Sequence, residues 1–226
     1  MKGLIAKLTL IGALGFTTPT FAEDARSLAR ADSLRLYTSS LNSGRSYSQN
    51  GEYSLAIDSF TLAQELGEKL QVSGLELSFI HANLANIHYK QKNNKKQLEE
   101  AEKAYELMPF NFINVNNLAF ALALNNTGLE RALSLSEQAI NTFQDTPLTG
   151  QFYDTLGFVQ FQMKDYEGAL ASLLYASQNI DPETEEGKRA LAFNHFYIAQ
   201  ALRILGKPGL EDYLVLPESV NYNGEE

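Results

Sequence analysis

The chain has 226 residues, 27 acidic and 18 basic side chains, a formal net charge of −9, and neither cysteine nor tryptophan. A chain of this length can bury a substantial core as a single domain. The lack of cysteine excludes a disulfide framework, a thiolate metal site and a thiol nucleophile. The acidic balance argues against nucleic acid and anionic membrane surfaces as partners.

Residues 1–22 have the composition of a secretory signal peptide. Lys2 and Lys7 give a positive start, residues 8–16 form an apolar run too short to span a bilayer, and Thr20 and Ala22 are the small residues that a signal peptidase needs. A buried N-terminal helix is the alternative. We expect residues 1–22 to be cleaved, and no later segment is long and apolar enough to cross a membrane. The sequence therefore predicts a soluble exported protein in a bacterial periplasm.

Pairs of alanines recur along the chain at one spacing. Three pairs lie seven residues apart: Ala56 and Ala63, Ala132 and Ala139, Ala169 and Ala176. Residues seven apart lie on the same helix face, two turns from each other. A small residue at both positions lets another backbone come close. Upstream of each pair lies an apolar stretch with Leu-Ala, Leu-Gly or a single Gly, so the pattern predicts stacked helical hairpins.

The motif of the first helix in each hairpin has five copies, which contain Gly44, Leu84-Ala85, Leu118-Ala119, Leu156-Gly157 and Ile198-Ala199. The second and third copies are 34 residues apart. A turn in the first copy is expected at Asn50-Gly51, and Pro109 and Pro182 close the second and fourth copies. Pro208 and Gly209 break the second helix of the last copy, as expected for a terminal unit that faces water.

This pattern resembles the tetratricopeptide repeat, a 34-residue helix–turn–helix unit with Leu-Gly in its first helix and a closing proline. The resemblance implies an all-α fold: a right-handed superhelix of four to five stacked antiparallel helical hairpins over residues 23–214, followed by a flexible tail at residues 215–226. Gln97 departs from the pattern, because alanine is usual there. Wider spacings predict longer second helices or loops near residues 65–74 and 183–188. A generic helical bundle is the alternative.

The resemblance also implies which residues face the concave surface, because the first helix of each tetratricopeptide repeat lines it. The residue two positions before the Gly or Ala of the motif points inward, and the five copies place Asn42, Asn83, Asn117, Thr155 and Tyr197 there. The asparagines resemble the ladder with which some members of the family hold a peptide. A carboxamide has a donor and an acceptor, so it can pair with the backbone of any sequence. The alternative is an ordinary polar helix face.

Other inward positions predict an aromatic and nearly uncharged wall. In addition to the ladder, we expect partner contacts from Asn86, Phe120, Phe158, Phe161 and Phe196. An exposed aromatic groove is typical of an interaction site. Alternatively, residues 214–217 fold back and cover it. The positions that would clamp a carboxylate in this family hold Gln151, Thr155 and Leu41, which are uncharged, so we expect no carboxylate clamp.

The sequence predicts neither catalysis nor a cofactor or metal. His81 and His88 lie seven residues apart, and His195 has the equivalent position in the last copy, but these are large core positions of the repeat. Histidine pairs that bind metal on a helix usually lie four apart. No phosphate-binding loop or nucleophile elbow is present. The Lys- and Glu-rich run at residues 90–102 is typical of a solvated surface.

These expectations combine into one functional hypothesis and three alternatives. The hypothesis is a non-catalytic scaffold or adaptor of the bacterial cell envelope, which holds an extended or helical segment of a partner protein in the concave groove. The first alternative is a periplasmic chaperone that shields many exported clients in the same groove. End-to-end self-association and an enzyme with an unrecognised site are the others.

Overall fold

The computed structural model describes residues 21–142, 146 and 148–213. Within these residues every regular element is helical, which confirms the all-α prediction. The signal-peptide prediction for residues 1–22 lies outside the described residues except for 21 and 22, which begin α2, and the predictions for 214–217 and 215–226 lie outside them entirely. None of the helices described is long and apolar enough to cross a membrane.

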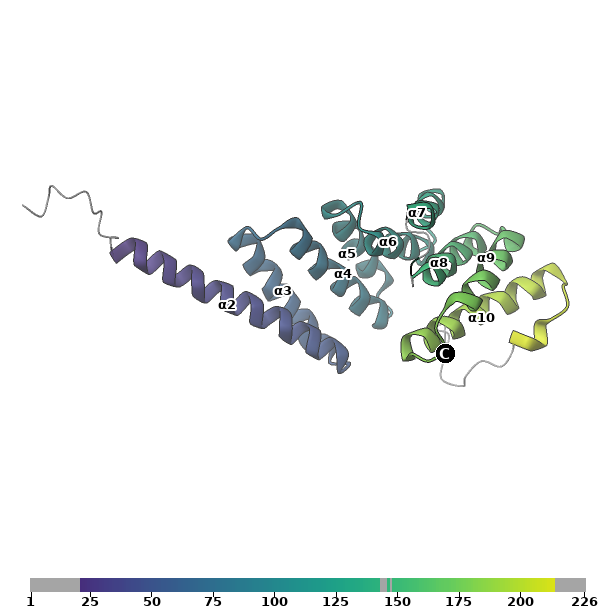
Figure 1. Ribbon diagram of the computed structural model, residues 1–226, viewed down its shortest axis with the longest axis horizontal. Helices are drawn as coiled ribbons and strands as arrows, with labels where there is room; N and C mark the ends of the chain where they lie inside the picture. The colour runs from purple at the N-terminus through teal and green to yellow at the C-terminus, as the bar shows by residue number, and fades with distance from the viewer. Residues whose placement is uncertain (1–20, 143–145, 147, 214–226) are drawn as a thin grey trace, which may run out of the picture.

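Successive helices pair into hairpins that stack along the molecule (Figure 1). The helix bounds are α2 (Phe21–Gln49) and α3 (Tyr53–Leu70), α4 (Gly74–Lys90) and α5 (Asn94–Leu107), α6 (Phe112–Leu124) and α7 (Leu129–Thr142), α8 (Thr149–Gln162) and α9 (Tyr166–Asn179), and α10 (Glu185–Leu205) with the short 3-10 helix η2 (Leu210–Tyr213). The first helices also contact one another, α6 with α8 and α8 with α10. This is the helical-repeat solenoid that the sequence motif predicts.

Local sequence signals set the helix starts. Ser73 and Glu76 form a capping box at the start of α4, in which each side chain bonds the other residue's backbone N–H. Four further helices, α5, α6, α9 and α10, start at residues whose side-chain oxygen accepts a bond from a first-turn N–H: Asn93, Asn111, Asp165 and Thr184. Gly51 lies in the α2–α3 turn with φ of 79°, which confirms the turn predicted there.

The repeated small residues are the points where the hairpins interlock. All six alanines of the three pairs are fully buried. Gly157 on α8 lies so close to α9 that an added Cβ would be 2.6 Å from Cγ of Leu173. An added Cβ at Gly44 would meet the ring of Phe60 at 3.0 Å. Each position therefore needs a small residue for helix packing, and none of them belongs to a binding surface.

The element lengths follow the prediction near residues 65–74 but not near 183–188, where α9 has the ordinary 14 residues and the extra length lies in α10, which has 21. Helix α3 has 18 residues, whereas α5, α7 and α9 have 14 each, so the wide spacing near residues 65–74 reflects a longer second helix. Helix α10 ends at Leu205, and Gly206 follows in the left-handed conformation at φ of 62°. The short η2 then replaces a full second helix, as Pro208 and Gly209 predict.

Candidate functional site

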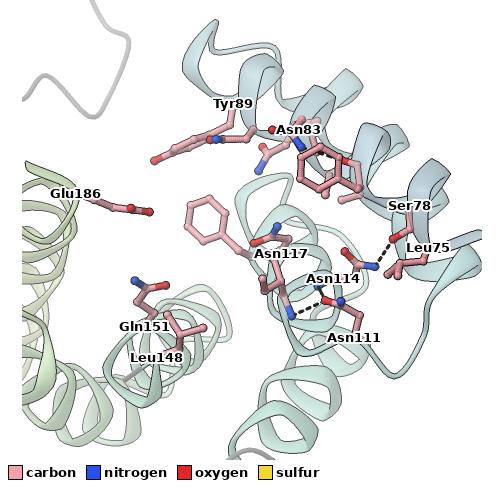
Figure 2. A pocket seen from close by; sticks show the side chains of 18 residues that line it. Leu75, Ser78, Asn83, Tyr89, Asn111, Asn114, Asn117, Leu148, Gln151 and Glu186 are labelled. Atoms are coloured by element: carbon pink, nitrogen blue, oxygen red, sulfur yellow. Dashed lines mark hydrogen bonds between the residues drawn. The ribbon is translucent and has the colours of Figure 1, made fainter. Parts of the chain in front are cut away.

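A pocket of about 560 Å³ lies between α4 and α6 and extends to the first turns of α8 and α10 (Figure 2). Its lining comes mainly from first helices of the hairpins, which is the face predicted to bind. Four of the predicted contact residues line it: Asn83, Asn86, Asn117 and Phe120. Helix α5 adds Gln97 and Ala101 to the lining. The structure therefore brings together the central part of the predicted site.

The asparagines of the pocket differ in how much hydrogen-bonding capacity they have left. The Nδ2 of Asn83 donates to the carbonyl oxygen of Phe79 on its own helix at 2.8 Å. Asn86 is exposed and Asn117 is half-buried, and neither carboxamide has a hydrogen-bond partner among the residues described. A free carboxamide can donate and accept at once. Asn86 and Asn117 are therefore the side chains best able to bond a partner's backbone.

Gln97 gives the pocket an acceptor that the fold leaves unused. Its side chain is 5% exposed, it lines the pocket, and its buried Oε1 has no hydrogen-bond partner within the described chain. An unpaired buried polar group costs about 1–3 kcal/mol, so a donor from water or a ligand is favoured there. Gln97 stands where alanine is usual in the repeat, but the sequence pattern did not predict it as a site residue. The replacement of the usual alanine was the feature of the sequence that could have indicated a role of Gln97 in the site.

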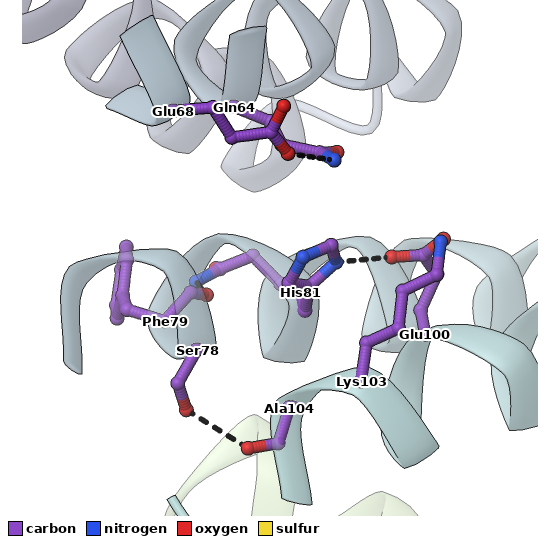
Figure 3. A network of polar contacts seen from close by, with 9 residues as sticks. Gln64, Glu68, Ser78, Phe79, His81, Glu100, Lys103 and Ala104 are labelled. Atoms are coloured by element: carbon purple, nitrogen blue, oxygen red, sulfur yellow. Dashed lines mark hydrogen bonds and ion pairs between the residues drawn. The ribbon is translucent and has the colours of Figure 1, made fainter. Parts of the chain in front are cut away.

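A buried polar cluster fixes the geometry at one end of the pocket. The Nδ2 of Asn114 donates to Oγ of Ser78 at 2.7 Å and to the carbonyl oxygen of Ala104 at 2.9 Å. The hydroxyl of Ser78 donates to the same carbonyl at 3.2 Å (Figure 3). Asn114 is 3% exposed, and its bonds join α6 to α4 and α5. No sequence pattern predicted the role of Asn114, because that role depends on contacts between three helices.

The structure corrects the prediction of an open aromatic wall. Phe158 has no exposed surface and Thr155 is 5% exposed, so neither offers an open contact surface. The rings pack on each other instead: Phe120 lies 5.4 Å from Phe158, and Phe158 lies 5.1 Å from Phe193 on α10, between ring centroids. Tyr89 on α4 extends the row, with its ring 5.3 Å from Phe120. The aromatic residues therefore join α4, α6, α8 and α10 more than they line a groove.

The remaining predicted contacts lie beyond the pocket. Phe161 and Phe196 are half-buried, and each ring contacts Tyr197, at 4.9 Å and 5.1 Å between centroids. Tyr197 is itself half-buried. Asn42 is exposed on α2 and is not among the residues that line the pocket. The asparagine row in the pocket therefore comes from α4 and α6, without the predicted member from the first hairpin.

Beside the pocket, Asp154 on α8 is a carboxylate in an aromatic setting. Its Oδ1 accepts a bond from Nδ2 of the buried Asn194 at 2.9 Å. Burial raises the pKa of Asp154 to about 7, against a usual value of 3.8. Burial, and then the charges of Tyr89 and Asp154, raise the pKa of Tyr197 to about 12. Burial, and then the charge of Asp154, also raise the pKa of Tyr89 on α4.

The pocket has almost no charge of its own. Of the 18 side chains that line it, Glu186 in the first turn of α10 is the charged one, and Figure 2 shows it pointing toward Tyr89. At the α2 end, the guanidinium of Arg45 lies 4.4 Å from the centroid of Phe79, which lines the pocket. A neutral segment, or one with a positive charge near α10, suits these surroundings electrostatically.

His81 and His88 are buried at 5% and 6% exposure, which confirms them as core residues. Nδ1 of His81 lies 2.6 Å from Oε2 of Glu100, and Lys103 donates to Oε1 of Glu100 at 2.8 Å (Figure 3). Glu100 is therefore half-buried, which corrects the prediction that the whole run at 90–102 is solvated surface. The ring of His195 contacts Tyr213. Within residues 21–142, 146 and 148–213, no three His, Asp or Glu side chains are grouped to hold a metal ion.

Comparisons with known proteins give the fold and no closer relationship. No protein-family model matches the chain, and no curated protein matches it in sequence. Among solved structures, BtubC from P. vanneervenii is similar at 20% identity and a TM-score of 0.62, over 85% of this chain and 83% of that one. A putative kinesin light chain from Podosopora anserina with nearly identical TPR-like repeats is similar at 16% identity and a TM-score of 0.59, over 78% and 90%. PilF from Pseudomonas aeruginosa is similar at 20% identity and a TM-score of 0.52, over 79% and 78%.

Proposed function

We propose that this chain, with its tetratricopeptide-repeat fold, is a non-catalytic scaffold or adaptor that holds an extended segment of a partner protein in the pocket between α4 and α6. The observation that carries the proposal is the set of unused carboxamide groups in the pocket. Asn86 and Asn117 are without partners in the described chain, and Gln97 has an orphan acceptor. The signal-like composition of residues 1–22 supports a place in the bacterial cell envelope.

The carboxamides that line the pocket come from more than one of its walls. An extended segment exposes one N–H and one C=O per residue, about 3.3 Å apart along the chain. Asn83 and Asn117 occupy equivalent positions one repeat apart, on the neighbouring walls formed by α4 and α6. Carboxamides on both walls, together with Gln97 on α5, can bond donors and acceptors of such a segment. Hydrogen bonds to the backbone do not depend on the partner's sequence. Side-chain contacts at the rim of the pocket therefore determine which partner binds.

The burial of the aromatic rings favours an adaptor over a chaperone. A chaperone that shields unfolded clients needs a large exposed apolar surface. Here Phe158 is fully buried and Phe193 is 7% exposed. The surface left in the pocket is rich in carboxamides, which suits a defined segment better than a variety of apolar ones.

Affinity capture from envelope extract tests the proposal, with the double variant Asn86→Ala/Asn117→Ala as bait beside the wild type. A matched control is Asn141→Ala/Gln178→Ala, which removes two exposed carboxamides from α7 and α9. We expect one dominant protein with the wild type and the control, and its loss with the pocket variant. Circular dichroism checks that all three baits are equally helical.

Two other outcomes would change the conclusion. Many weakly bound proteins on the wild type, all lost with the pocket variant, would favour the chaperone. Equal capture by all three baits would show that the pocket does not bind the partner.

A further inference from the structure

The pocket between α4 and α6 deepens from an exposed rim to a buried floor. Asn86 and Ile113 line the pocket and are exposed, whereas Ala85 on α4 and both Gln97 and Ala101 on α5 line it and are buried. Helix α5 packs against both α4 and α6, so its side chains close the pocket between them. Ala101 lies one helical turn after Gln97 on the same face, and alanine side chains fill little of the space at this depth. We call Ala85, Gln97 and Ala101 the pocket floor.

The carboxamide of Gln97 on the pocket floor makes no hydrogen bond that the fold needs. Its Oε1 is buried without a partner, and its Nε2 donates to none of the residues described. An unpaired buried polar group destabilises a folded protein, and alanine, which is usual at this position of the repeat, would avoid that cost. The buried Asn114 lines the same pocket, and its Oδ1 likewise accepts no bond from the described chain. Unbonded carboxamide groups at this depth are better explained by a ligand that bonds them.

The chemistry of the pocket floor selects among the side chains that a bound segment could place there. A charged group would lose its hydration without gaining a partner of opposite charge, because Glu186, the one charged lining residue, belongs to the first turn of α10. An apolar group would leave the carboxamide of Gln97 unbonded. A second carboxamide has the same donor and acceptor and can form two parallel N–H···O bonds with Gln97. Because the terminal torsion of a glutamine turns readily, this pairing is available in either orientation of the amide.

We propose that Gln97, with Ala85 and Ala101, forms a subsite for the side chain of an asparagine or glutamine in the segment that the pocket holds. The proposal rests on the proposed function, because it assigns side-chain specificity to the same binding event. Backbone bonds to Asn86 and Asn117 accept any sequence, and Gln97 adds selectivity from the floor to the side-chain contacts at the rim. Charged and apolar side chains at this place in the segment bind more weakly.

Selection of peptides from a random displayed library, with members about 12 residues long, tests the subsite without knowledge of the natural partner. The baits are the wild type, Gln97→Ala, and Gln178→Ala as a control that removes an exposed carboxamide from α9. Gln97→Ala restores the residue that is usual in the repeat, so circular dichroism and urea unfolding should show it to be at least as stable as the wild type. Peptides selected on the wild type and on Gln178→Ala are expected to share an asparagine or glutamine at one position. Peptides selected on Gln97→Ala are expected to lack that preference.

Substitution in a selected peptide measures the contribution of the carboxamide. Leucine in place of the shared asparagine, or methionine in place of the shared glutamine, keeps the approximate size and removes the hydrogen-bonding groups. This change should weaken binding to the wild type about tenfold and leave binding to Gln97→Ala almost unchanged. A loss of the same size on both proteins would show that the peptide's carboxamide bonds something other than Gln97, and would overturn the subsite.

The outcomes of the selection separate this inference from the proposed function. Peptides that bind the wild type with no shared carboxamide residue, or with the same one on Gln97→Ala, would overturn the subsite and leave the pocket as a binding site. A water molecule that satisfies Gln97 would give that result. No selection on any bait above the bare support would contradict both the subsite and the proposed function.

Nuclear magnetic resonance of the isotope-labelled wild type supplies a readout that a merely structural role of Gln97 would not produce. Both signals of the Gln97 side-chain NH₂ group should shift when the selected peptide is added, because its carboxamide gains hydrogen bonds. The peptide with leucine or methionine at the shared position should leave these signals close to their positions in the free protein. Equal shifts with the two peptides at saturation would contradict the subsite.

Discussion

Replacing Asp154 by asparagine should make the folded protein more stable, and only at neutral and alkaline pH. The side chain keeps its shape and its bond from Nδ2 of Asn194, so the substitution removes the charge and little else. The pKa of Asp154 is about 7 in the folded protein and close to 3.8 when the chain is unfolded. The folded state therefore holds the proton more tightly. The protonated carboxyl makes its full contribution to the free energy of unfolding below pH 3.8, and this contribution is lost as the pH rises to about 7.

The size of the effect follows from the two pKa values. At about 1.4 kcal/mol for each pH unit, the interval from 3.8 to about 7 sets an upper limit of about 4 kcal/mol. Part of Asp154 remains accessible to water, which lowers the cost of ionisation. We therefore expect Asp154→Asn to raise the free energy of unfolding by about 2 kcal/mol at alkaline pH and by nearly nothing at acidic pH.

Urea unfolding followed by circular dichroism, at about pH 3.5 and about pH 8, measures both values. Asp58→Asn controls for the general loss of one negative charge, because Asp58 is exposed on α3. It should change stability little at either pH. The reasoning is refuted if Asp154→Asn has the same effect at both pH values, or if it destabilises the protein at about pH 8.

Three further substitutions test the packing. Gly157→Ala places a Cβ 2.6 Å from Leu173 and should cost about 1–3 kcal/mol in urea unfolding, whereas Gly74→Ala meets only ordinary contacts and should cost nothing. Asn114→Ala removes the donor that joins α6 to α4 and α5 and should cost about 2–3 kcal/mol; no loss would show that the cluster is not structural. Burial raises the pKa of Glu100, but its bonds to His81 and Lys103 outweigh this and hold the pKa below its usual value. Glu100→Gln should therefore cost about 2 kcal/mol at neutral pH and nothing at acidic pH, where the bonds are already lost; a loss independent of pH would contradict this.

The sequence predicted the architecture well because the relevant signals are local. Small residues at fixed spacing mark where helices touch, and capping residues mark where helices begin, so each hairpin could be assigned from its own residues. The same phase placed Asn83, Asn117 and Phe120 on the face that lines the pocket. Position along a helix decides which way a side chain points, and that part of the site needed no tertiary information.

The burial of each side chain and its interaction partners were harder to predict, because both depend on neighbouring helices. Phe158 points to the predicted side, but rings from α6 and α10 bury it completely. Glu100 belongs to a charged run, yet His81 from α4 draws it into a buried pair. Gln97 and Asn114 acquire their roles from contacts across helices that no spacing rule describes. The sequence therefore indicates the face of each side chain, and packing decides what remains accessible.

The central claim is that the pocket between α4 and α6 is the surface that holds the partner. Photo-crosslinking from single positions in the intact cell tests it most directly. Asn86 lines the pocket and is exposed, so a benzophenone amino acid fits there without disturbing the core. Asp58 on α3 and Gln178 on α9 are exposed positions on second helices and serve as controls. We predict one crosslinked protein from position 86 and none from 58 or 178. The same adducts from the control positions, or none from position 86, would contradict the account.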